Sequence, residues 1–85
     1  MAKELKINLN GIEKVKKFVN EINKTTCDCT IVSDSDKESN RYIIDAKSIM
    51  GIFSLNLDKP LTLKIHTDDE MIINQIENNI KKFKI

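Results

Sequence analysis

The sequence predicts an α+β fold in which helices cover one face of an antiparallel sheet. Four segments alternate apolar and polar residues, which is typical of strands with one buried face. Two long segments repeat apolar residues at helical spacing, and a short third one is apolar nearly all round. The predicted order is β-α-β-β-α-β-α, and elements with one apolar side each pack as two layers.

Length and composition indicate one ordinary domain. The chain has 85 residues, of which 40% are hydrophobic and 32% are charged, with a formal net charge of +1. We therefore expect a single domain over residues 1–85. The near-zero charge argues against nucleic acid or an anionic membrane as partner, because both require clustered Lys and Arg. Residues 1–9 lack the apolar run of a signal peptide, and no segment approaches the ~20 apolar residues of a membrane span, so we expect a cytoplasmic protein.

The first strand is predicted over residues 4–9 and the first helix over residues 11–24. Asn10 and Glu13 have the spacing of a capping box, which predicts that Asn10 caps this helix. The residues expected to face the core are Leu5, Ile7 and Leu9 in the strand and Ile12, Val15, Phe18, Val19 and Ile22 in the helix. The pairs Glu13–Lys17 and Lys17–Glu21 are expected on the solvent side of the helix.

A hairpin follows, with strands predicted over residues 26–32 and 41–46. Alternation places Cys29 and Ile31 on the buried side of the first of these strands. Residues 33–40 are rich in Ser, Asp and Asn, which predicts the connecting turn. Acidic residues recur at every second position of this turn, but it has no glycine at the sixth place, so a solvated turn is expected and not a calcium loop.

The last third of the chain supplies the short helix, the last strand and the last helix. Residues 47–55 predict the short helix, with Ser48 as its N-cap. Leu61, Leu63 and Ile65 are expected inward on the strand after Pro60. The last helix is expected to open with a capping box at residues 67–70 and to bury Ile72, Ile73, Ile76, Ile80 and Phe83.

This order of elements, together with the residues from Lys47 to Leu55, resembles HPr, the histidine-containing phosphocarrier of the bacterial sugar phosphotransferase system. The run Lys-Ser-Ile-Met-Gly at residues 47–51 is the specific part, and the resemblance extends over essentially the whole chain. It implies an open-faced β-sandwich, with a four-stranded antiparallel sheet in the order 1-4-2-3 and three helices on one face. It also implies a protein that is not an enzyme.

The residues that make the family a phosphocarrier are missing. Family members have a His shortly after an Asn-Gly-like turn, followed two residues later by Arg and then Pro; the imidazole accepts phosphate, and the helix N-terminus and the arginine hold the anion. Here Asn10-Gly11 is followed by Ile12 and Glu13, about two residues short of the family pattern, and Glu13 brings a carboxylate to the end of the helix that receives the anion. His66 is the only histidine, and it is expected about five residues, at ~3.4 Å each, from this turn. We therefore predict that the chain does not carry phosphohistidine.

Ser48 is the candidate regulatory phosphorylation site. In Gram-positive members the serine of this run is phosphorylated by an ATP-dependent kinase, which turns the protein into a corepressor for carbohydrate genes. Some relatives without the active histidine keep only this role, and the present sequence is similar to them. A phosphate at the helix N-cap would gain roughly 0.3–1 kcal/mol from the helix dipole, and Lys47 offers a nearby cation. The alternative is that Ser48 only caps the helix.

Lys47, Ile49, Met50 and Phe53 are the candidate partner-binding residues. A helix this short cannot bury all its apolar residues on one stripe, and in the family such positions form the patch that docks on other proteins. The implied partners are phosphotransferase-system components, a serine kinase or a transcription regulator, with the chain itself a monomer. The alternative is that these residues are all core.

Cys27 and Cys29 carry the alternative function. Two cysteines are too few for a disulfide scaffold, and we expect reduced thiols. A small α+β domain could still use the pair for metal or thiol chemistry, although metal sites usually supply three or four ligands. A third hypothesis is a relic with a fold but no partner. We expect no cofactor, because nothing in the chain resembles a catalytic triad, a phosphate-binding loop or a dinucleotide fingerprint.

Overall fold

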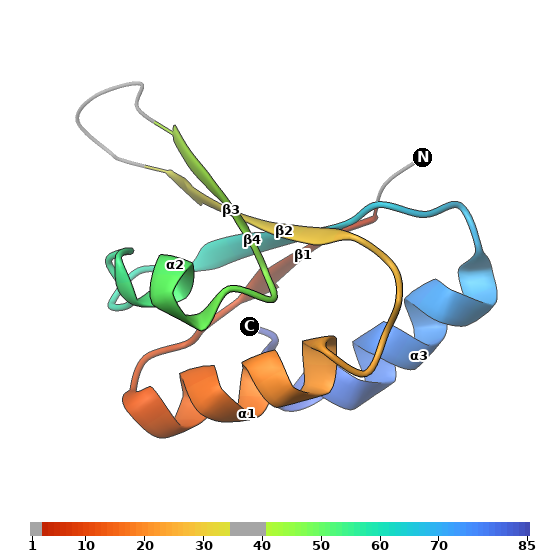
Figure 1. Ribbon diagram of the computed structural model, residues 1–85, viewed down its shortest axis with the longest axis horizontal. Helices are drawn as coiled ribbons and strands as arrows, with labels where there is room; N and C mark the ends of the chain where they lie inside the picture. The colour runs from red at the N-terminus through yellow and green to blue at the C-terminus, as the bar shows by residue number, and fades with distance from the viewer. Residues whose placement is uncertain (1–2, 35–40) are drawn as a thin grey trace.

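Helices cover one face of a four-stranded antiparallel sheet in the computed structural model, which describes residues 3–34 and 41–85 (Figure 1). The elements are β1 (Lys3–Ile7), α1 (Ile12–Ile22), β2 (Cys29–Asp34), β3 (Arg41–Asp45), α2 (Ile49–Phe53), β4 (Leu61–Ile65), α3 (Glu70–Ile80) and a 3-10 turn, η1 (Lys81–Phe83). The strand order is β1-β4-β2-β3. The expected open-faced sandwich, its element order and its strand order are confirmed.

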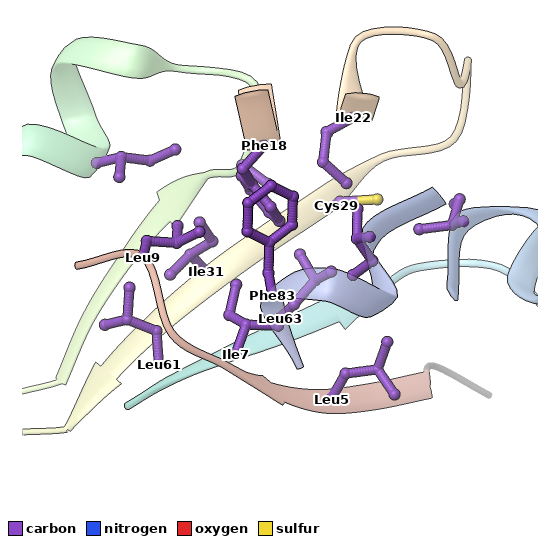
Figure 2. Close-up of a cluster of buried hydrophobic side chains, with 14 of the residues drawn as sticks. Leu5, Ile7, Leu9, Phe18, Ile22, Cys29, Ile31, Leu61, Leu63 and Phe83 are labelled. Atoms are coloured by element: carbon purple, nitrogen blue, oxygen red, sulfur yellow. The ribbon is translucent and has the colours of Figure 1, made fainter. Parts of the chain in front are cut away.

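The core lies between the sheet and the helices, as the alternation predicts. The strand register places Leu5, Leu63 and Ile31 in one row across β1, β4 and β2, and all three side chains are buried. The helices close over this row, and the ring of Phe18 in α1 meets Phe83 edge to face, with 5.7 Å between ring centroids (Figure 2). Such pairs add roughly 0.5–1.5 kcal/mol to the free energy of apolar burial.

No helix of the described residues covers the opposite face of the sheet (Figure 1). One outward row runs through Lys6, Thr62, Val32 and Ile43, from β1 to β3. Thr62 and Val32, on the two central strands, are buried although they face outward, and the Lys6 ammonium donates a hydrogen bond to Thr62 Oγ1 at 2.8 Å. Ile43, on the edge strand β3, is 65% exposed. On the outward face, the side chains of the two central strands are therefore buried in this row, and an apolar side chain is exposed at the β3 edge.

The predicted capping of α1 is wrong. The N-cap is Gly11, which has a φ of +116° and supplies no side-chain hydrogen bond. Asn8 Oδ1 instead accepts the backbone N–H of Asn10 at 2.9 Å, so the turn is stabilised before Asn10 and the helix begins later. Ile12 therefore points into solvent and is 62% exposed, not buried as predicted, and Glu21 pairs with Lys24 at 2.6 Å instead of with Lys17.

The predicted start of α3 is also two residues early. Asp69 is the N-cap, and its carboxylate accepts the backbone N–H groups of Met71 and Ile72, whereas Thr67 Oγ1 accepts the N–H of Asp69. The inward stripe is still the predicted one, because Ile76 is buried on it. The predicted hairpin is confirmed by the pairing of β2 with β3, but β2 begins at Cys29. The turn residues 35–40, including the calcium-loop comparison, lie outside the described residues.

Candidate functional site

The start of α2 is built by a tight turn after β3. The backbone N–H of Ser48 donates to the Asp45 carbonyl at 3.0 Å, and the Lys47 N–H donates to Asp45 Oδ1 at 2.9 Å. Ser48 is the N-cap, as predicted, and its exposed Oγ accepts the Gly51 N–H at 3.2 Å. This hydroxyl lies at the surface and at the amino end of the helix.

α2 packs closely against β3 at Gly51. A Cβ at this position would lie 3.2 Å from Ser48 Oγ, which would have to give by a few tenths of an ångström, and 3.4 Å from Ile44 Cδ1, at van der Waals contact. Ile52, the next residue, is fully buried and attaches the helix to the core. The contact with β3 and the burial of Ile52 decide which side of the short helix faces outward.

The exposed side of α2 presents Met50 and Phe53. Met50 is 77% exposed and Phe53 is 39% exposed, whereas Ile49 is half-buried against the core. The structure thus brings two of the three predicted apolar docking residues to the surface and keeps most of the third inside. A flexible Met beside a Phe is a combination suited to protein contacts.

Lys47 has a structural contact that the sequence did not suggest. Its side chain is half-buried, and its ammonium donates to the Thr25 carbonyl at 2.8 Å, which joins the start of α2 to the connection between α1 and β2. The predicted cation beside Ser48 is therefore engaged elsewhere. Sequence reasoning could not find Thr25, because a backbone carbonyl 22 residues away carries no residue-type signal.

The start of α1 presents an apolar residue and a carboxylate. Ile12 is exposed in the first turn, next to Gly11, and Glu13 is exposed beside it. α1 packs against α2, so Ile12 belongs to the same helical layer as Met50 and Phe53 (Figure 1). Sequence reasoning missed Ile12 because its spacing fits the buried stripe of α1. The positive φ of Gly11 and the Asn8 side chain set where the stripe begins.

His66 lies away from the start of α1, as predicted. Ile65 pairs with Lys3 at one end of β1, and α1 follows the other end of that strand. The His66 ring nitrogen Nε2 is hydrogen bonded to Thr30 Oγ1 at 2.9 Å, and its backbone N–H donates to the Asp28 carbonyl at 2.9 Å. The imidazole therefore belongs to the outward face of the sheet and contributes nothing to the first turn of α1.

The two cysteines are free thiols in a setting that disfavours thiol chemistry. Cys29 is buried in the core (Figure 2), and its thiol donates to the Cys27 carbonyl at 3.8 Å. Burial, aided by the neighbouring Cys27, raises the pKa of Cys29 from 9.0 to about 12, so the thiolate that would attack or bind a metal is scarce at neutral pH. Within residues 3–34 and 41–85, no three His, Cys, Asp or Glu side chains converge on a metal site.

Comparison with known proteins identifies the family and the fold. A family model described as "PTS HPr component phosphorylation site" matches residues 12–82. The crystal structure of HPr-C-His from Thermoanaerobacter tengcongensis superposes with a TM-score of 0.64 at 24% identity, covering 94% of this chain and 92% of that chain. The phosphocarrier protein HPr from Bacillus anthracis superposes with a TM-score of 0.63 at 22% identity, covering 99% and 96%. No curated protein matches the sequence.

None of the helices in the described residues has the length and apolar character needed to cross a membrane.

We expect Lys47→Met to lower the free energy of unfolding by about 1–2 kcal/mol, because the Thr25 carbonyl loses a charged hydrogen-bond donor. Urea denaturation followed by circular dichroism measures this change. The control is Lys14→Met, which removes an exposed lysine of α1 and should change stability by no more than ~0.5 kcal/mol. Equal stability of the two variants would show that the bond to Thr25 contributes nothing.

Proposed function

Since this chain belongs to the HPr family of the phosphotransferase system, we propose that it is a regulatory or protein-binding member that does not carry phosphohistidine. The observation that carries the proposal is the start of α1, where Ile12 and Glu13 occupy the first turn. His66, the only histidine of the sequence, follows β4 and lies near the end of β1 that is distant from α1. A carboxylate at the positive end of a helix repels the phosphate that a phosphocarrier must hold there. Family members act in the cytoplasm and are not enzymes, and we infer both properties for this protein.

Docking on other proteins is the activity that the surface supports. Met50 and Phe53 project from a helix that Ile52 anchors in the core, so they are held in place without being covered. Ile12, exposed on the neighbouring helix, adds apolar surface to the same layer. Such side chains, rimmed by charged residues, are typical of small protein-binding surfaces. The proposed partners are phosphotransferase-system components, a serine kinase or a transcription regulator.

Ser48 is the proposed switch for this docking. Its hydroxyl is exposed at the amino end of α2, next to Met50 in the helix, so a kinase can reach it and a phosphate would change the charge of the docking surface. Three residues upstream, the Asp45 carboxylate accepts the backbone N–H of Lys47, and the Lys47 ammonium donates to the Thr25 carbonyl. Phosphorylation would therefore leave an uncompensated negative charge for a basic partner to bind, with no refolding required.

Incubation with phosphoenolpyruvate and the first enzyme of the phosphotransferase system should leave the protein without acid-labile phosphate, because no imidazole lies at the start of α1. Intact-mass spectrometry at neutral pH measures the transfer, with a histidine-bearing HPr as the positive control. A phosphate that is lost in His66→Ala would overturn this part of the proposal.

Incubation with ATP and an HPr serine kinase should add one phosphate, which Ser48→Ala abolishes. Mass spectrometry of peptides locates the modified residue. Because Ser48→Ala also removes the N-cap, which costs about 0.5–2 kcal/mol, its fold is checked by circular dichroism. Ser54→Ala, which alters the hydroxyl at the other end of α2, is the control and should be labelled like the wild type. An unchanged mass of the wild-type protein would remove Ser48 from the proposal.

Met50→Asp should weaken binding to a purified phosphotransferase component or serine kinase about tenfold or more, because a charge replaces an exposed apolar contact. Titrations of isotope-labelled protein followed by NMR measure the affinity and the residues that shift. Met71→Asp is the matched control, since Met71 is 82% exposed on α3 and lies outside the proposed surface. Equal effects of both substitutions would rule out α2 as the docking helix.

A further inference from the structure

The two edges of the sheet are treated differently. Beside β1, the chain returns after η1: the Asn8 N–H donates to the Phe83 carbonyl at 2.8 Å, the Ile85 N–H donates to the Lys6 carbonyl at 3.2 Å, and Ile7 bridges Lys84. Along the outer edge of β3, on the side away from β2, none of the described residues forms such a ladder. Edge strands with free backbone groups are templates for pairing with another strand, and proteins normally cover or charge them.

The hydrogen bonds on the two sides of β2 show which backbone groups of β3 face outward. The Asp28 carbonyl faces β4, because it accepts the backbone N–H of His66 at the end of that strand. The Cys29 carbonyl faces β3, because it accepts the backbone N–H of Ala46. Because successive residues of a strand point their backbone groups to opposite sides, the even-numbered residues of β3 pair with β2. The backbone groups of residues 41, 43 and 45 therefore face the open edge.

We propose that β3 pairs antiparallel with β3 of a second copy of this chain, around a two-fold axis at Ile43. In this register the N–H and C=O of Ile43 bond those of Ile43 in the other copy, and residue 41 lies opposite residue 45. The sequence supplies Arg41 and Asp45 at these two positions, so each pair joins opposite charges. The two Ile43 side chains, each 65% exposed in one copy, would cover each other on the outward face.

Charge selects this register over its neighbours. An axis at Arg41 or at Asp45 also aligns outward-facing backbone groups, but it places two like charges directly opposite each other, which is destabilising. An axis at residue 42 or 44 also aligns outward-facing backbone groups, but it places Ile43 opposite Arg41 or Asp45, so no opposite charges meet. The Asp45 carbonyl also accepts from Ser48, which weakens but does not block the outer bonds. Among these registers, the axis at Ile43 is therefore the one that pairs opposite charges.

One strand per copy is a small interface, so the association is weak and depends on concentration. Sedimentation equilibrium between about 10 μM and 1 mM should show a molar mass rising from one copy towards two. Ile43→Lys should leave a single copy over the whole range, because two like charges would meet at the axis. The control Met71→Lys, on α3, should associate like the wild type. This proposal replaces the expected monomer and is independent of the proposed function.

Charge reversal tests the register itself. Arg41→Asp and Asp45→Arg should each weaken self-association about tenfold or more, because each places like charges at both outer pairs. An equimolar mixture of the two variants should restore association, since each outer pair then joins Asp to Arg. Asp45→Arg also removes the carboxylate that accepts the Lys47 N–H, so its melting temperature is measured first, and Ile43→Lys gives the answer if it does not fold.

Three results would overturn the proposal. A wild-type chain that remains a single copy at 1 mM would exclude the pairing. Self-association that Ile43→Lys leaves unchanged would place the contact on another face. A mixture of Arg41→Asp and Asp45→Arg that associates no better than either variant alone would indicate that β3 binds the strand of a different partner or pairs in another register.

Discussion

The structure depends on burial from one side only. Helices cover a single face of the sheet, so each strand must send its apolar side chains to that face, and the row of Leu5, Leu63 and Ile31 meets Phe18 and its neighbours there. A domain of this size buries a little over ~60% of its unfolded surface, so the inward set leaves few apolar residues to spare. Any large apolar side chain found outside this layer therefore calls for an explanation, and Met50, Phe53, Ile12 and Ile43 are the main examples.

The candidate docking surface follows from the same constraint. α2 is too short to form without the sheet, and it is held by Ile52 in the core and by the close approach of Gly51 to Ile44. Once these contacts are made, Met50 and Phe53 have no buried position left to occupy. Ser48 closes the first turn of the helix and remains exposed for the same reason. Met50 and Phe53 are thus held in place by their chain neighbours Gly51 and Ile52, which face the strand and the core.

The proposed loss of phosphohistidine chemistry is compatible with an intact scaffold, because α1 packs through residues beyond its first turn. The core of α1 is Val15, Phe18 and Ile22, whereas phosphate transfer in the family depends on residues before and in the first turn. Ile12 and Glu13 are both exposed in that turn, so the packing of the helix does not depend on them. This separation explains how a chain at 22–24% identity to HPr structures keeps their fold along nearly its whole length.

Alternation and helical spacing by themselves determined the four strands, the three helices and nearly all the inward-facing residues, because which face a residue joins is a local property of strand and helix geometry. The Ser48 cap was also predictable, because Ser is a preferred N-cap residue and stands directly before the apolar run. Tertiary structure decided the rest. Gly11 and Asp69 are the N-caps where Asn10 and Thr67 were expected, and the first turn of α1 leaves Ile12 exposed. The hydrogen bond from Lys47 to the Thr25 carbonyl joins segments that are distant in the chain, and pairing with β2 decides which side of β3 faces solvent. Periodicity carries no information about such contacts.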